Sequence, residues 1–172
     1  MGLHSPFGYV DYEVPMAELL IDILDKLCAH CHTNNDYCKG CAECPAGNLV
    51  FECKSYVLGA EEEDKHYELY TSAEWQNKRK ELYGKEDPPE EVERWRKLAD
   101  KCRPESEVLR AMKRKVEGIT PHPFFYVRPG TRRAPYERPK ALEDFAGLTS
   151  DLKKLREERR NQIRRSFETQ AT

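Results

Sequence analysis

The sequence is short of apolar residues, which make up 38% of its 172 residues against 35% that are charged. This is little apolar material for a globular chain of such a length. The longest apolar stretch, residues 16–27, is interrupted by four charges, so we expect no membrane span. We expect instead that part of the chain is a tail, a water-exposed helical surface or a surface that binds a partner.

Motifs that bind nucleotides or carry out hydrolysis are also missing. The sequence contains no glycine-rich phosphate loop, no dinucleotide-binding fingerprint and no clear Ser/His/Asp arrangement. An independent active site is therefore not indicated. The first residues lack a basic segment followed by an apolar one, so we expect no signal peptide and a cytoplasmic location, where thiols stay reduced.

The net charge of −2 hides an uneven distribution of charge along the chain. Residues 1–120 carry 17 basic and 24 acidic side chains, whereas residues 121–172 carry 12 basic and 7 acidic ones. The basic end could contact an acidic protein or a nucleic acid. The slightly acidic balance of the whole chain argues against a dedicated nucleic-acid binder, so we expect no nucleic-acid partner.

The spacing of apolar residues predicts a mainly α-helical fold. Apolar residues recur at three- and four-residue steps as far as Leu27, so we expect a helix that starts just after Pro15 and carries Leu27 on its inner face. A short helix is expected over residues 49–58, although a strand would also suit its β-branched and aromatic residues. Further helices are expected from Ser72 to Gly84, from Pro88 to Cys102, from Pro104 to Gly118 and from Ser150 to about Phe167.

These elements divide the sequence into three predicted parts. Residues 1–60 hold an N-terminal arm and a small Cys-rich, metal-binding helical hairpin, and residues 61–118 form a helical region. Residues 119–172 hold an extended strap and a basic C-terminal helix. Five of the eleven prolines lie in residues 119–140, among aromatic and arginine side chains, which prevents a long regular element there.

A run of cysteines is the most distinctive feature of the sequence. Six of the seven cysteines lie in one short segment, as one CxxC step, a double CxxC step and a single residue. In order, they are Cys28, Cys31, Cys38, Cys41, Cys44 and Cys53. A CxxC turn directs two thiolates at one point, and four thiolates complete a tetrahedral zinc site or hold an iron–sulfur cluster. The segment therefore predicts a metal centre.

The double CxxC step favours an iron–sulfur cluster of the 4Fe-4S type as the cofactor. Bacterial ferredoxins use this double step and also place a proline directly after a ligand, as Pro45 does here. The gap before the last cysteine differs, so we do not expect a ferredoxin domain. Zn²⁺ is the alternative, with His30 and His32 as further ligand candidates, and a set of disulfides or uncoordinated thiols is the third possibility.

Only four of the six clustered cysteines are needed as ligands. Cys41 is the first choice because it belongs to both CxxC steps of the loop, and Cys44 comes next. Cys28 and Cys31 rank after these two. Cys38 and Cys53 are the alternatives. The remaining cysteine of the chain is expected to be structural.

The predicted function follows from the all-cysteine site and the scarcity of core residues. We expect a small iron–sulfur accessory subunit without activity of its own, bound to the larger subunit of an oxidoreductase complex. The cluster would relay electrons or stabilise the catalytic subunit. The alternative is a zinc-stabilised adaptor or assembly factor that binds protein or nucleic acid, and a third hypothesis is a redox sensor whose cysteines form a reversible disulfide.

Overall fold

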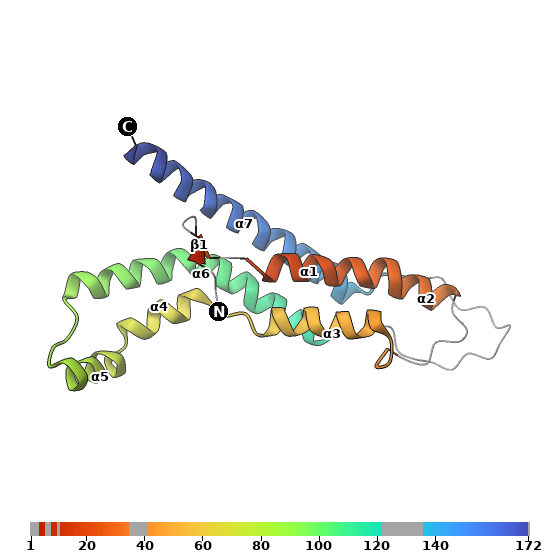
Figure 1. Ribbon diagram of the computed structural model, residues 1–172, viewed down its shortest axis with the longest axis horizontal. Coiled ribbons are helices and arrows are strands. Elements are labelled where there is room, and N and C mark those ends of the chain that lie inside the picture. The colour runs from red at the N-terminus through yellow and green to blue at the C-terminus, as the bar shows by residue number, and fades with distance from the viewer. Residues whose placement is uncertain (1–3, 6–7, 10, 35–40, 122–135, 172) are drawn as a thin grey trace. The chain divides into compact units, whose positions relative to one another are not determined.

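The computed structural model describes residues 4–5, 8–9, 11–34, 41–121 and 136–171, and these are mainly helical (Figure 1). The predicted helical class, with a long helix at the C-terminal end, is therefore confirmed. Two short strands, β1 (His4–Ser5) and β2 (Gly8–Tyr9), pair antiparallel. In the part of the chain that the structure describes, every helix is too short or too polar to cross a membrane.

The helices follow one another with short connections. Those of the N-terminal third are α1 (Glu13–Asp22), the π-helical segment η1 (Ile23–Cys28), α2 (Ala29–Asn34) and α3 (Pro45–Leu58). The remaining ones are α4 (Glu63–Thr71), α5 (Ala73–Tyr83), α6 (Pro89–Glu117) and α7 (Lys140–Gln170). The sequence did not predict α4, because its first turn lies in a run of acidic residues.

The described residues form two compact units. The first unit combines Met1–Ala60 with Ala111–Thr172, and the second unit is Glu61–Arg110. In the first unit, α3 contacts α1 and η1, and α1 also contacts α7. Apolar side chains from these elements form its core; the most deeply buried are Leu20, Val50, Val57, Met112, Val116, Leu142, Phe145 and Leu152.

The first helix starts earlier than predicted, and its inner face carries Leu20, Ile23 and Leu24 but not Leu27. It begins before Pro15, which therefore lies in the first turn of the helix. A proline is tolerated there because the N–H groups of the first turn make no hydrogen bond within the helix. The carboxylate of Asp11 accepts a hydrogen bond from the Val14 amide at 3.1 Å. Leu27, predicted to face inward, is 52% exposed, because the wider π-helical turn of η1 shifts the residues that follow Ile23 around the axis.

The predicted second helix is confirmed in type, although α3 begins at Pro45 and is longer than expected. Cys44 occupies the N-cap position, so the proline ring lies at the first helical position, where its geometry is favourable. The buried face of α3 carries Val50, Cys53 and Val57. Tyr56, on the same helix, is exposed.

Two predicted helices are in fact one, because α6 continues through Pro104. The proline ring lies on the exposed side of the helix. On the opposite side, buried residues recur at three- and four-residue steps before and after it; they are Ala99, Cys102, Glu105, Ser106, Leu109, Met112 and Val116. Burial of this continuous face offsets the lost hydrogen bond, which a sequence pattern alone does not show.

The last helix begins at Lys140 rather than at Ser150. Leu142, Phe145 and Thr149 are buried and belong to this additional N-terminal part. Most of the expected strap, residues 122–135, lies outside the described residues.

A buried arginine links α7 to the start of α1. The side chain of Arg156 is 5% exposed, and its guanidinium donates to the carboxylates of Asp11 and, at 2.8 Å, Glu13. Nearer the middle of both helices, Lys153 pairs with Glu18 at 2.9 Å. The basic C-terminal region therefore neutralises acidic residues of the N-terminal helix within the same unit.

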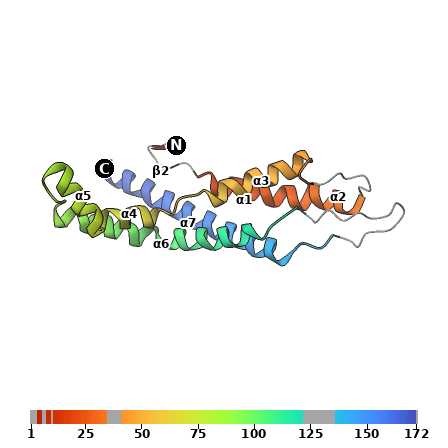
Figure 2. The same ribbon diagram turned by 90° about the horizontal axis from the view of Figure 1, so that it is seen from below.

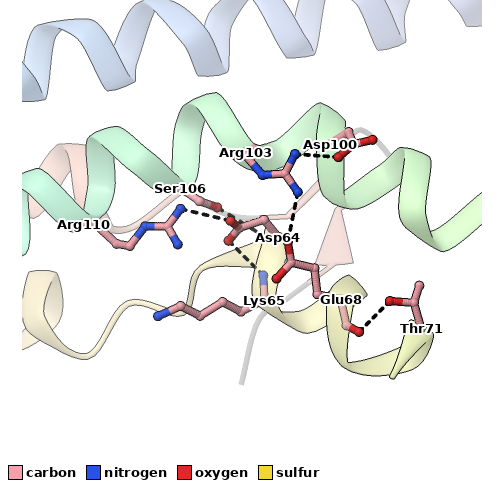
Figure 3. Close-up of polar contacts among 8 residues, drawn as sticks. All are labelled: Asp64, Lys65, Glu68, Thr71, Asp100, Arg103, Ser106 and Arg110. Atoms are coloured by element: carbon pink, nitrogen blue, oxygen red, sulfur yellow. Dashed lines mark hydrogen bonds and ion pairs between the residues drawn. The ribbon is translucent and has the colours of Figure 1, made fainter. Parts of the chain in front are cut away.

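The second unit has a polar interior in place of a large aliphatic one. Asp64 is 2% exposed, and its carboxylate accepts hydrogen bonds from Arg110 at 3.0 Å and from the Lys65 amide at 2.8 Å (Figure 3). The amide of Asp64 donates to the Ser106 hydroxyl at 3.4 Å. Beside this network, the ring of Tyr70 packs against Trp75 and Trp95, with centroid separations of 4.9 Å in both cases.

The predicted helix after Ser72 is confirmed at both ends. The Ser72 hydroxyl accepts a hydrogen bond from the Trp75 amide at 3.2 Å, as an N-cap does. Gly84 ends α5 with φ of 70°, a left-handed conformation that suits glycine.

We predict that Arg156→Ala destabilises the first unit by about 3 kcal/mol, since two partly buried carboxylates would lose their counter-charge. Urea unfolding followed by far-UV circular dichroism measures the loss. The matched control is Lys153→Ala, whose ion pair with Glu18 is exposed and should contribute little. Equal losses from the two substitutions would contradict a structural role for the buried arginine.

The pKa of Asp64 makes the stability of the second unit depend on pH. Burial alone would raise this pKa, but hydrogen bonds from Ser106, the Lys65 amide and Arg110, with the charge of Arg110, lower it below its ordinary value of 3.8. A lowered pKa in the folded state contributes stability that is fully present above the ordinary value. The contribution is lost as pH falls through the lower, folded-state value.

We therefore predict that Asp64→Asn lowers the unfolding free energy of the second unit by about 2 kcal/mol at neutral pH. Both tryptophans of the chain, Trp75 and Trp95, lie in this unit, so their fluorescence during urea unfolding reports on it. The gap between variant and wild type should narrow below pH 3.8. Asp100→Asn, at an exposed position, is the control, and a gap that stays constant down to low pH would refute the prediction.

Candidate metal centre

The two CxxC regions of the sequence lie at the same end of a helix pair. The chain runs through α1, η1 and α2 in one direction, and α3 returns beside α1 and η1 (Figures 1 and 2). The α2 helix and the N-terminus of α3 therefore lie at the same end. Cys28 is the last residue of η1 and Cys31 lies in α2, whereas Cys41 and Cys44 lie just before α3.

The turn that carries Cys41 and Cys44 packs onto the first turn of α3. The Cys44 amide donates to the Cys41 carbonyl at 3.3 Å, and the Asn48 amide donates to the Cys44 carbonyl at 2.9 Å. Gly47 is essential for this approach, because a Cβ atom there would lie 1.9 Å from the Cys41 carbonyl oxygen. Gly47 was not among the predicted site residues, although a glycine three residues after Cys44 is visible in the sequence.

The N-cap position of Cys44 is chemically suited to a metal centre. Amide groups in the first turn of a helix have no partners within the helix and favour negative charge nearby. A site built from several thiolates carries such a charge. Cys31, Cys41 and Cys44 are each partly exposed.

The other two described cysteines of the run are buried. Cys53 is 1% exposed and lies between Val50 and Val57 on the core face of α3. Burial, and to a smaller degree the charge of Glu52, raises the pKa of the Cys53 thiol, although a hydrogen bond from the residue's own backbone to the thiol opposes the shift. A thiol in these surroundings is favoured in its neutral form, whereas a metal ligand is a thiolate.

Cys28 lines a cavity of about 300 Å³ in the first unit. Leu24, Ile119, Tyr136 and Leu142 are among its other lining residues. Burial raises the pKa of Tyr136, and negative charge on Asp25 and Cys28 adds to this shift while Arg138 opposes it. The lining of this cavity is thus mostly apolar, and besides Cys28 its polar side chains are those of Thr120, Tyr136 and Glu137.

The described side chains do not complete the predicted site. Among them, no three His, Cys, Asp or Glu residues come together in a way that could hold a metal ion. Cys38 lies outside the described residues, and so does the side chain of His32. The six-cysteine ligand set therefore stays a prediction, and the structure adds only where five of its members lie.

We predict that Gly47→Ala displaces the turn that carries Cys41, because the new methyl group would overlap the Cys41 carbonyl. Alkylation of the metal-depleted chain, followed residue by residue with mass spectrometry, should show faster modification of Cys41 and Cys44. The matched control is Gly147→Ala on α7, where an added Cβ meets nothing within 4 Å. Unchanged alkylation rates in the Gly47 variant would show that the turn does not depend on this contact.

Comparison with known proteins adds no further residues to the candidate metal centre. None of the protein-family models, curated proteins or solved structures compared with the chain matches it.

Proposed function

We propose that the chain is a metal-binding accessory subunit that holds an iron–sulfur cluster at the loop end of the α1–α3 pair. Cys31, Cys41 and Cys44 would supply three ligands, and either Cys28 or Cys38 the fourth. The supporting observation is that two cysteine pairs, separated in the sequence by residues 32–40, lie at the same end of one helix pair. Four thiolates are a typical ligand set for such a cluster.

The surroundings of this end suit a relay or a structural clasp. The amides at the N-terminus of α3 would stabilise a negatively charged centre, and hydrogen bonds to cluster sulfurs tune the potential of such centres. Partly exposed thiols would leave the centre near the protein surface, where a redox partner can approach. This placement would suit a role inside a redox complex, either in electron transfer or in stabilising the catalytic subunit.

Exposed apolar side chains on the same helices support the presence of a partner subunit. On α3, Leu49, Phe51, Tyr56 and Leu58 lie outside the core, and Leu19 does so on α1. Single exposed apolar residues are ordinary, but several on two neighbouring helices are typical of a binding surface. The accessory subunit would thus be stabilised by its complex.

The alternative proposal is a protein-binding adaptor that holds Zn²⁺ at the same site. The same four thiolates would complete a tetrahedral zinc site, and a structural zinc site contributes directly to folding. The nucleic-acid version of this alternative is weakened, because Arg138, Lys153 and Arg156 face acidic residues of their own unit.

We predict that anaerobically purified chain contains about four iron and four sulfide ions and shows visible absorbance. A Cys41→Ser/Cys44→Ser variant should lose both ions. Cys102→Ser should keep them, because Cys102 belongs to the second unit, where its thiol donates to Glu63 at 3.3 Å. A colourless wild-type chain with stoichiometric zinc would refute the iron–sulfur proposal and support the zinc adaptor. A chain with neither metal would refute both proposals.

A further inference from the structure

The cavity that Cys28 lines has the properties of a ligand site. Its volume is about 300 Å³, and its walls come from η1, from the residues that follow α6 and from the start of α7, all within the first unit. Leu24, Ile119 and Leu142 line it and are themselves buried. Protein interiors are close-packed, and an unfilled apolar cavity of this size lowers stability. In a chain with only 38% apolar residues, a ligand that fills this space would therefore be strongly stabilising.

Two sets of polar contacts fix the walls of the cavity. The Lys54 ammonium donates to the carbonyl of Ile119 at 2.6 Å and to that of Glu117 at 3.4 Å, which holds the turn after α6. The Arg138 guanidinium donates two hydrogen bonds to the Asp25 carboxylate, at 3.2 and 2.7 Å, and so holds the segment before α7 against η1. A site whose walls are already fixed loses little conformational freedom when a ligand binds.

The volume and the lining side chains define the size and polarity of a ligand. An engineered apolar cavity of about 150 Å³ binds benzene, so a cavity of about 300 Å³ has room for two fused aromatic rings. The hydroxyls of Thr120 and Tyr136 belong to lining residues, and a hydroxyl both donates and accepts hydrogen bonds. Burial, followed by the charge of Asp25, raises the pKa of Tyr136, so this hydroxyl keeps its proton at neutral pH. The lining therefore suits an apolar molecule that carries one polar group.

The charge at the cavity disfavours an anionic ligand. Glu137 lines the cavity and is exposed, so its carboxylate lies where the cavity opens to solvent. Among the described residues of the lining, none is basic, and the neighbouring Arg138 is paired with Asp25. An anion would therefore lose hydration inside the cavity and meet a like charge at its opening.

We propose that this cavity binds a small, uncharged, mainly apolar molecule about the size of two fused aromatic rings, with one hydroxyl or similar group within reach of Thr120 and Tyr136. The apolar walls would supply most of the affinity, and the two hydroxyls would orient the ligand. This inference goes beyond the proposed function. Of the residues that line the cavity, only Cys28 also belongs to the candidate metal centre.

The test titrates 2-naphthol into the full chain and follows the fluorescence anisotropy of the probe. 2-Naphthol has two fused rings and one hydroxyl, and it is uncharged at neutral pH. We expect saturable binding with Kd on the order of 100 µM. 2-Naphthoate carries a carboxylate on the same rings and should bind at least about tenfold more weakly. No saturable binding of 2-naphthol, or equal binding of the two probes, would overturn the proposal.

A cavity-filling substitution tests the assignment of the site. Ala141→Leu places a larger side chain in the lining and should weaken 2-naphthol binding at least about tenfold. Its matched control, Ala73→Leu, makes the same change at an exposed position of the second unit and should leave Kd unchanged. Far-UV circular dichroism shows whether each variant is folded. The same Kd for the wild type and for folded Ala141→Leu would overturn the assignment.

Methyl NMR of the wild-type chain locates the probe without any substitution. The methyl signals of Ile119 and Leu142, which line the cavity, should shift when 2-naphthol is added. Those of Leu82, an exposed residue of α5 in the second unit, should not shift. Shifts at Leu82 without shifts at the two cavity residues would place the probe on the surface and overturn the proposal.

The charge preference has a test of its own. Glu137→Gln removes the carboxylate at the opening and should strengthen binding of 2-naphthoate about threefold, with little effect on 2-naphthol. An unchanged Kd for 2-naphthoate would overturn the role of Glu137 in excluding anions. None of these measurements uses the metal content of the chain, so failure of this proposal and failure of the metal proposal give different results.

Discussion

The ion pairs between Arg156 and two carboxylates, Asp11 and Glu13, organise the first unit. A buried guanidinium is stable only when its charge is compensated, so the start of α1 has to lie against this point of α7. Asp11 also accepts a hydrogen bond from the Val14 amide, which links the arginine to the beginning of α1. The basic C-terminal region thereby holds the start of α1, the helix that continues through η1 to Cys28.

In the second unit, polar and aromatic side chains take the place of a large aliphatic core. Its interior combines the hydrogen-bonded Asp64 with the aromatic rings of Tyr70, Trp75 and Trp95. Aromatic rings bury a large area per residue, and a satisfied carboxylate tolerates burial. Such an interior explains how a segment rich in charged residues still forms compact helices.

Much of the local structure could be predicted from the sequence. The cap formed by Ser72 and the left-handed Gly84 depend on neighbouring residues only, so α5 was expected at its observed position. The metal centre was inferred from thiol spacing alone. The structure adds that the turn between Cys41 and Cys44 relies on Gly47, where a Cβ atom would overlap the Cys41 carbonyl.

What the sequence determined by itself is the helical class, because propensity, capping and periodicity are properties of short segments. Only the tertiary structure decided which faces are buried. Leu27 turns outward after η1, Cys53 lies in the core, and α6 continues through Pro104. In each case the outcome depends on the free energy of packing against residues distant in the sequence, which local patterns do not contain.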